Sequence, residues 1–207
     1  MSRRLIARPS PRIIVLRWQE GISWRLAWRR LLEIQVRHPI EIAWVFDDGR
    51  SQSHLIAPAP DWDDWNDAAE QIHGLSRETV VRDGVPHDIV ARQMVEALTG
   101  HALFASAPSW DGKWMSVLLR AAGFPRHTLR LQDTDIALRD TATHILRDAV
   151  PPEELEARVR DLVAWANTTK DSPPAHRALA EATEERAIWR RLQDRAQALA
   201  AAPSMQL

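Results

Sequence analysis

Residues 39–57 read PIEIAWVFDDGRSQSHLIA, and this stretch decides the fold. Its first part, 39–46, is apolar and rich in β-branched and aromatic residues, which is typical of a buried strand. Asp48-Gly49 supplies the positive φ that a tight hairpin turn needs. Pro58 and Pro60 follow a second apolar run, and proline cannot donate a hydrogen bond to a sheet. The stretch therefore predicts two antiparallel strands, 39–46 and 51–57.

On either side of this hairpin, the spacing of apolar residues predicts the other elements. Further strands are expected at 12–18, 102–105 and 129–131. Helices are expected at 61–74, 86–98, 110–122, 135–146, 153–167 and 175–201, several of them bounded by proline and glycine. Strands that come early and helices that dominate later predict one α/β domain, a mixed sheet flanked by helices with a helical C-terminal half.

Composition narrows the classes of function. The 207 residues contain no cysteine, which excludes disulfides, thiolate zinc sites and cysteine nucleophiles. No apolar run approaches the roughly 20 residues of a membrane span, and the patch at 13–16 is too short for a signal peptide, so we expect a cytoplasmic protein with no membrane partner.

Charge is distributed unevenly along the chain. Residues 1–37 hold nine arginines and two glutamates, giving +7, and the total of −1 leaves −8 for the remainder. The basic segment is open to three interpretations: a phosphate-binding footprint, a targeting peptide or a solvated tail.

Four sequence elements follow one another in a recognisable order. They are PIEIAWV at 39–45 with Asp48-Gly49 and Leu55-Ile56, IHGLS at 72–76, LFASAPSWD at 103–111, and HRALAEA at 176–182. Together they resemble the DEDD 3′-5′ exonucleases of the histidine-containing, proofreading-subunit type. The resemblance implies a ribonuclease H-like α/β fold for residues 39–200. It also implies stepwise release of nucleoside monophosphates from the 3′ ends of single-stranded DNA or RNA.

The same resemblance implies roles for particular residues. Asp111 and Glu181 would bind Mg²⁺ or Mn²⁺, Glu20 would be a poor third metal ligand, and His176 would be the general base. Two such ions about 3.5–4 Å apart neutralise charge on the attacking and leaving oxygens of a phosphodiester, and hard cations prefer oxygen ligands. Glu181 stands where the family has Asp, and an added methylene displaces the carboxylate.

Each of these residues also has an interpretation that needs no catalysis. Asp111 is a helix N-terminal acid that the helix dipole favours, His176 starts a helix, and Glu181 is a solvated charge. Asp133-Thr134 is interpreted as a helix cap, and the Trp62/Trp65 pair as core residues rather than a base-stacking platform.

The family's first motif, Asp-x-Glu on the first strand, is absent. Its two positions fall on Arg17 and Gln19 if the strand is 13–18, or on Ala27 and Arg29 if a short loop is counted back from Pro39. Cationic side chains there would repel metal ions. Residues 1–38 therefore form a divergent Arg- and Trp-rich segment.

Two explanations of that segment remain. Either Arg17, Arg29 or Arg30 binds phosphate where metal once lay, or the segment results from a frameshift or misassigned start. Three functions follow: a two-metal 3′-5′ exonuclease, a degenerate nucleic-acid binder without catalysis, or a protein-interaction module on the same fold.

Overall fold

The computed structural model describes residues 13–20, 38–169 and 176–202, the first of these ranges by its backbone only. Six strands form one mixed sheet in the order β4-β3-β2-β1-β5-β6. β2 pairs antiparallel with both β1 and β3, whereas β5 runs parallel to β1 and β6 parallel to β5. The strands are β1 (Ile13–Glu20), β2 (Pro39–Phe46), β3 (Ser51–Ala57), β4 (Val85–Pro86), β5 (Ala102–Ala105) and β6 (Leu131–Asp133).

The β2–β3 hairpin turns as its sequence requires. Gly49 has φ 92°, and the Phe46 and Arg50 backbones close the turn with a 2.8 Å hydrogen bond. The guanidinium of Arg186 lies against this turn and donates to the carbonyl oxygen of Asp47 at 2.8 Å from Nη2 and 3.2 Å from Nε. A Cβ on Gly49 would lie 3.3 Å from that guanidinium, so the turn is also a close approach between hairpin and helix.

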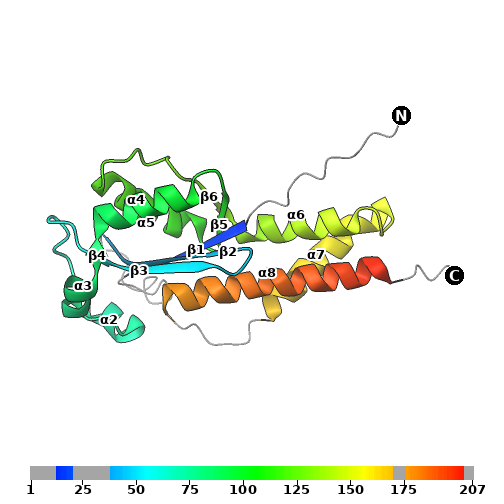
Figure 1. Ribbon diagram of the computed structural model, residues 1–207. Coiled ribbons are helices and arrows are strands. Elements are labelled where there is room, and N and C mark those ends of the chain that lie inside the picture. The colour runs from blue at the N-terminus through cyan, green and yellow to red at the C-terminus, as the bar shows by residue number, and fades with distance from the viewer. Residues whose placement is uncertain (1–12, 21–37, 170–175, 203–207) are drawn as a thin grey trace.

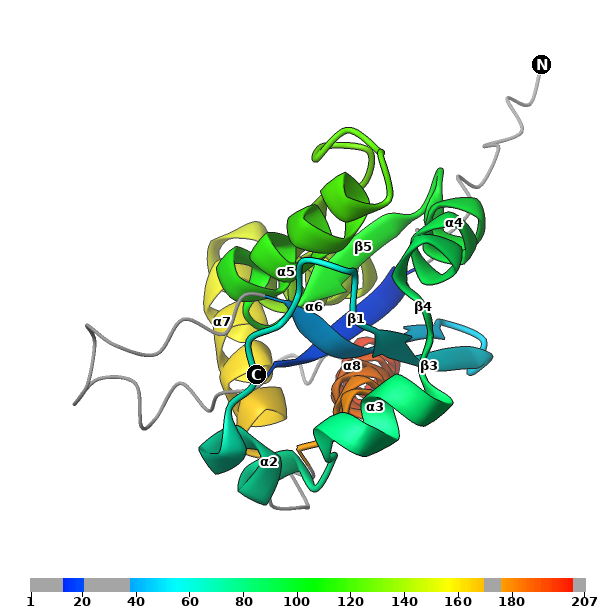
Figure 2. The same cartoon turned by 90° about the vertical axis from the view of Figure 1, so that its left-hand side faces the viewer.

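Two layers of helices cover the sheet. α4 (His87–Leu98) and α5 (Pro108–Ala121) lie on one face, and α8 (Ala178–Ala201) lies on the other (Figure 2). α6 (Thr134–Leu146) and α7 (Pro152–Thr168) pack with α8 and extend beyond the sheet (Figure 1). Two short helices, α2 (Asp67–His73) and α3 (Arg77–Asp83), lie beside the other end of α8.

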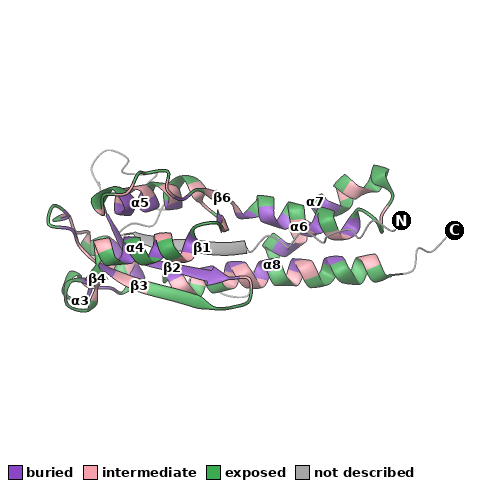
Figure 3. Ribbon diagram, turned by 45° about the horizontal axis from the view of Figure 1, so that its top comes forward, coloured by how far each residue is buried: buried purple, intermediate pink, exposed green. Residues whose placement is uncertain are grey.

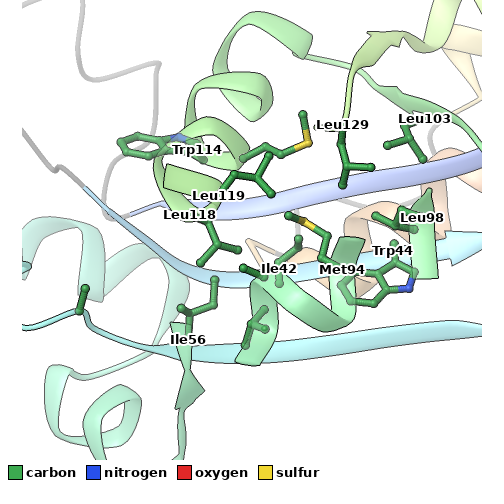
Figure 4. Packing of buried hydrophobic residues seen from close by; sticks show 14 of the residues in the cluster. Ile42, Trp44, Ile56, Met94, Leu98, Leu103, Trp114, Leu118, Leu119 and Leu129 are labelled. Carbon is green, nitrogen blue, oxygen red and sulfur yellow. The ribbon is translucent and has the colours of Figure 1, made fainter. Parts of the chain in front are cut away.

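Each face of the sheet has its own hydrophobic core, and β2 contributes to both because its side chains alternate. Ile42 and Trp44 pack with Ile56 against α4 and α5, where Met94, Leu98, Leu118 and Leu119 are fully buried (Figure 4). Val45 points the other way and packs with α6, α7 and α8. The buried stripes of the helices accordingly face the sheet or one another (Figure 3).

The predicted fold class is confirmed. The hairpin strands and the central strand at 102–105 have the predicted bounds, and the predicted first strand corresponds to β1. The helix cap predicted at Asp133-Thr134 is also confirmed, since the Asp133 side chain accepts a hydrogen bond from the Asp135 amide at the start of α6. The boundary at residue 38 between a divergent segment and an exonuclease-like domain stays a prediction.

Several boundaries differ from the prediction. The helix predicted from residue 61 begins only at Asp67, because Asn66 caps it by accepting from the amides of Ala68 and Ala69. Trp62 is nevertheless buried in the core, as predicted, from an irregular segment. β6 lies two residues later than expected, and α3 and β4 were not predicted. The last helix begins at Ala178, and residue 175, its predicted start, lies outside the described residues.

The described helices include none that is both long enough and apolar enough to cross a membrane.

Candidate functional site

The topology brings several chain segments to one edge of the sheet. β1 and β5 are parallel, so their carboxyl ends lie at the same edge, and α5 begins directly after β5. β2 runs the opposite way, so it starts at this edge, where Glu41 pairs with position 19 of β1. The edge therefore carries the end of β1, the start of β2 and the first turn of α5.

Glu41 attaches the start of α8 to this edge. Its side chain is only 2% exposed and accepts hydrogen bonds from a guanidinium and from a backbone amide. Arg177 donates from Nη2 at 2.8 Å and from Nε at 3.2 Å, and the backbone amide of Ala178 donates at 2.8 Å. The hydrogen bond that Arg177 donates to the Glu41 carboxylate raises the pKa of Arg177. The carboxylate thus pairs with a cation and also caps the positive end of the helix dipole.

His73, from the IHGLS element, belongs to the same neighbourhood. It is the last residue of α2, it is buried, and its Nδ1 accepts from the Leu75 amide at 3.0 Å. Burial lowers the pKa of His73, the carboxylates of Glu70 and Glu41 oppose this, and the nearby Arg177 and His176 add to it. Since Nδ1 is an acceptor, the ring is neutral with its proton on Nε2.

Asp111 lies in the first turn of α5 and is 5% exposed. Its amide donates to the Ala107 carbonyl at 2.9 Å, which is the first turn of the helix. A buried carboxylate at a helix N-terminus is electrostatically favoured by the dipole. Its neighbour Trp110, by contrast, lies on the protein surface, with 49% of its area exposed.

His176 and Glu181 come from the start of α8. His176 has φ 50°, a left-handed conformation that histidine adopts more readily than most residues, and it directly precedes the clamped Arg177. Glu181 is half-buried in the first turn, its amide donating to the Arg177 carbonyl at 3.1 Å. Because Glu41 fixes Arg177 and Ala178, it also fixes the position of the two predicted residues on either side.

The predicted ligand set of Asp111, Glu181 and Glu20 stays a prediction, because the structure does not describe the Glu20 side chain. Among the described residues, no group of three or more His, Asp or Glu side chains is arranged to hold an ion. Glu20 ends β1 opposite Pro39, and its side chain lies outside the description. Glu41 is engaged by Arg177 and Ala178. The donor set that is described therefore does not fit a two-metal site.

Of the two registers considered for the missing motif, the first falls within a described strand. Positions 17 and 19 lie within β1, opposite Ala43 and Glu41, at the edge just described. The alternative positions Ala27 and Arg29, together with Arg30, lie outside the described residues.

Comparisons with solved structures identify the fold. The chain superposes on the zinc-bound form of an E. coli exonuclease I complex with single-stranded DNA at a TM-score of 0.60 and 14% identity, covering 92% of this chain and 42% of that one. The chain shares the fold of that part of exonuclease I. A structure of exonuclease I that bears on its processivity gives a TM-score of 0.58 and 15% identity, and the E. coli enzyme in complex with a dA16 oligonucleotide gives a TM-score of 0.57 and 13% identity.

In both of these further cases 91% of the chain is covered. The chain spans about two fifths of the length of these exonuclease I structures, 42% in each case. No model of a known protein family matches the sequence. No curated protein matches it either.

The sequence pointed to Asp111, His176 and Glu181 but not to Glu41 or Arg177. Arg177 stands inside the HRALAEA element, and Glu41 is the one charged residue in an apolar strand that is buried throughout. A lone acid in a buried strand was a signal that a partner must exist, because buried charges are paired.

Proposed function

We propose that this chain binds single-stranded nucleic acid on an exonuclease I-like fold, and that its 3′-end site has lost the carboxylates needed for efficient hydrolysis. The observation that carries the proposal is the composition of the sheet edge. The first turn of α5, which carries Asp111, and the start of α8, which the Glu41 carboxylate holds, lie at this edge, as binding of a strand end would require. If the first carboxylate pair belongs to β1, its two positions are Arg17 and Gln19 rather than acids.

The proposed ligand takes its support from the structural neighbours, since two of the exonuclease I structures hold single-stranded DNA. Binding in this chain would depend on phosphate contacts from basic groups and on base contacts from aromatic ones. The choice between DNA and RNA is part of the test.

A second candidate function is 3′-5′ exonuclease activity with Mg²⁺ or Mn²⁺. One observation favours it, namely that the first turns of α5 and α8, which carry Asp111 and Glu181, are attached to the same edge of the sheet. In this proposal Asp111, Glu181 and Glu20 are the metal ligands, and His176 accepts the proton of the attacking water. It requires Glu20 to reach the edge as a third ligand.

The deciding experiment uses the full chain and 3′-labelled single-stranded oligonucleotides of the same sequence in DNA and in RNA. Strand binding is measured by fluorescence anisotropy in EDTA, and loss of the 3′ nucleotide is measured with Mg²⁺ or Mn²⁺. The active-site variant is Asp111→Asn, and its matched control is Asp148→Asn, whose side chain is 88% exposed in the helical half.

Binding without cleavage supports the first proposal. Cleavage that depends on metal and is lost in Asp111→Asn but kept in Asp148→Asn supports the exonuclease and refutes the first. Absence of both binding and cleavage refutes both and leaves the protein-interaction module.

A further inference from the structure

We propose that the outer side of α5 and the segment after it form the track along which a single strand lies, with Trp110 as a base-stacking platform. We call this surface the basic stripe and define it as Trp110, Lys113, Arg120, Arg126 and Arg130. The class of ligand rests on the proposed function above, whereas the surface is argued from its own charges and exposure.

The stripe is continuous along the helix. Trp110, Lys113 and Arg120 are spaced by three and seven residues, which places them on one side of α5. All three are exposed, and the helix rise separates the first from the last by about 15 Å. Arg126 and Arg130 follow in the exposed segment that leads from α5 to β6.

Trp110 is held where a base could stack on it. Lys113 lies between two indoles, with Nζ 5.4 Å from the ring centroid of Trp110 and 4.7 Å from that of Trp114. Trp114 is buried in the core, so Lys113 links a fixed ring to an exposed one. Stacking on such a ring is tolerant of sequence because every base has a π-face.

The charges of the stripe are not neutralised by neighbouring acids. Residues 112–132 contain no Asp or Glu in a chain whose overall charge is −1. Within the described part of the chain, Lys113, Arg120, Arg126 and Arg130 make no ion pair with a carboxylate. Arg120 donates to the Ser116 carbonyl and Arg126 to His127 Nε2.

Several other exposed arginines of the described chain are paired with acids, although Arg139, Arg190 and Arg195 are not. Arg50, Arg82, Arg92 and Arg158 each pair with an adjacent acid, at 2.7 to 3.3 Å. Unpaired cations beside an exposed indole therefore distinguish the outer side of α5, and their charge complements a phosphate backbone.

The stripe also leads to the candidate site. Trp110 directly precedes Asp111, so a strand lying on the stripe has one end at the sheet edge described above. A single strand suits this surface better than a duplex, because only unpaired bases present a face to the indole.

The test measures binding of a fluorescein-labelled oligothymidylate to the full chain in EDTA, over a range of salt concentrations. Trp110→Ala should weaken binding roughly five- to hundredfold, the range known for loss of one stacked base, whereas Trp110→Phe should restore most of it. A triple variant, Lys113→Ala/Arg120→Ala/Arg126→Ala, should reduce the slope of log K against log salt by about 2, since each phosphate contact to a single strand contributes about 0.7.

The control is a triple variant on the helical half, Arg139→Ala/Arg147→Ala/Arg195→Ala. It removes the same charge, and Arg195 also lies over an indole, 4.3 Å from the ring of Trp165. It should leave affinity within about twofold and the salt slope unchanged. Circular dichroism checks that every variant is folded.

The outcomes separate this proposal from the function on which it rests. If the unmodified chain binds no strand, the proposed function fails. If it binds and the two triple variants weaken binding equally, or if Trp110→Ala binds like the unmodified chain, the basic stripe is refuted while strand binding stands.

Discussion

The ion pair between Glu41 and Arg177 is expected to be the most sensitive polar contact in the molecule. Removing one partner of a buried pair costs about 3–5 kcal/mol when the other charge is left uncompensated. In Arg177→Met the buried Glu41 carboxylate keeps the Ala178 amide, and the Arg177 side chain was 48% exposed, so the lower end applies. We expect a loss of about 3 kcal/mol.

Removing the acid of the pair instead of the arginine should cost less. In Glu41→Met the released guanidinium can be hydrated, and the loss is mainly that of the helix cap and the charged hydrogen bonds, about 2 kcal/mol. The double variant leaves no uncompensated buried charge, so it should lose about 3 kcal/mol rather than the sum of about 5. The coupling energy is therefore expected to be about 2 kcal/mol.

Urea unfolding followed by tryptophan fluorescence measures these free energies, with Arg158→Met as the control. Arg158 pairs with Glu154 on the surface, both side chains being more than half exposed, so its loss should stay within about 0.5 kcal/mol. Additive costs in the cycle, or a cost for Arg177→Met no larger than that of the control, would contradict the reasoning.

Three further predictions concern stability. Burial lowers the pKa values of His38, His54 and His73 below the ordinary 6.5. The unfolded chain therefore binds more protons, and the free energy of unfolding should fall as pH drops below about 6.5, by up to about 1.4 kcal/mol per pH unit for each histidine. His38→Phe, which keeps a ring stacked on Trp62, should flatten this slope in unfolding titrations, and an unchanged slope would exclude His38 as a contributor. Gly84→Ala should destabilise the protein by more than about 2 kcal/mol, because the added Cβ would clash with the Val80 carbonyl oxygen and lie 2.6 Å from the Ala57 nitrogen. Gly112→Ala, in a helix with open space around it, should instead stabilise the protein by about 0.5–1 kcal/mol. Equal shifts of the two melting temperatures would contradict both expectations. Leu118→Ala, in the core between α5 and the sheet, should cost about 2–5 kcal/mol in urea unfolding, while Val81→Ala, 58% exposed on α3, should cost less than about 0.5 kcal/mol.

Much of the architecture could be predicted from local signals. The β2–β3 hairpin depends on Asp48-Gly49 and the prolines beyond it, and all of these act over a few residues. Helices that begin at proline and end at glycine were predicted for the same reason. α3 and β4 were missed because they are short and their formation depends on packing: Val80 is buried against Ile40 and Leu75, and β4 pairs only two residues with β3.

The candidate site was predictable only in part. The positions of Asp111, His176 and Glu181 followed from an order of motifs, and the structure brings the elements that carry them to one edge. The Glu41–Arg177 contact joins residues 136 positions apart, so no local pattern could predict it. The exposure of Trp110 was equally hidden, because the sequence does not tell which side of α5 faces the core until the sheet is known.

The contact of Glu41 with Arg177 and the contact of Arg186 with the β2–β3 turn have a consequence for how the chain folds. The hairpin can form early, since its strands are adjacent in the sequence, but its inner face then carries an acid without its counter-ion. Both contacts must wait for α8, 136 and 139 positions later. Closing so long a loop is slow, and the docking of α8 should therefore be the step at which the hairpin face is sealed and the whole domain becomes cooperative.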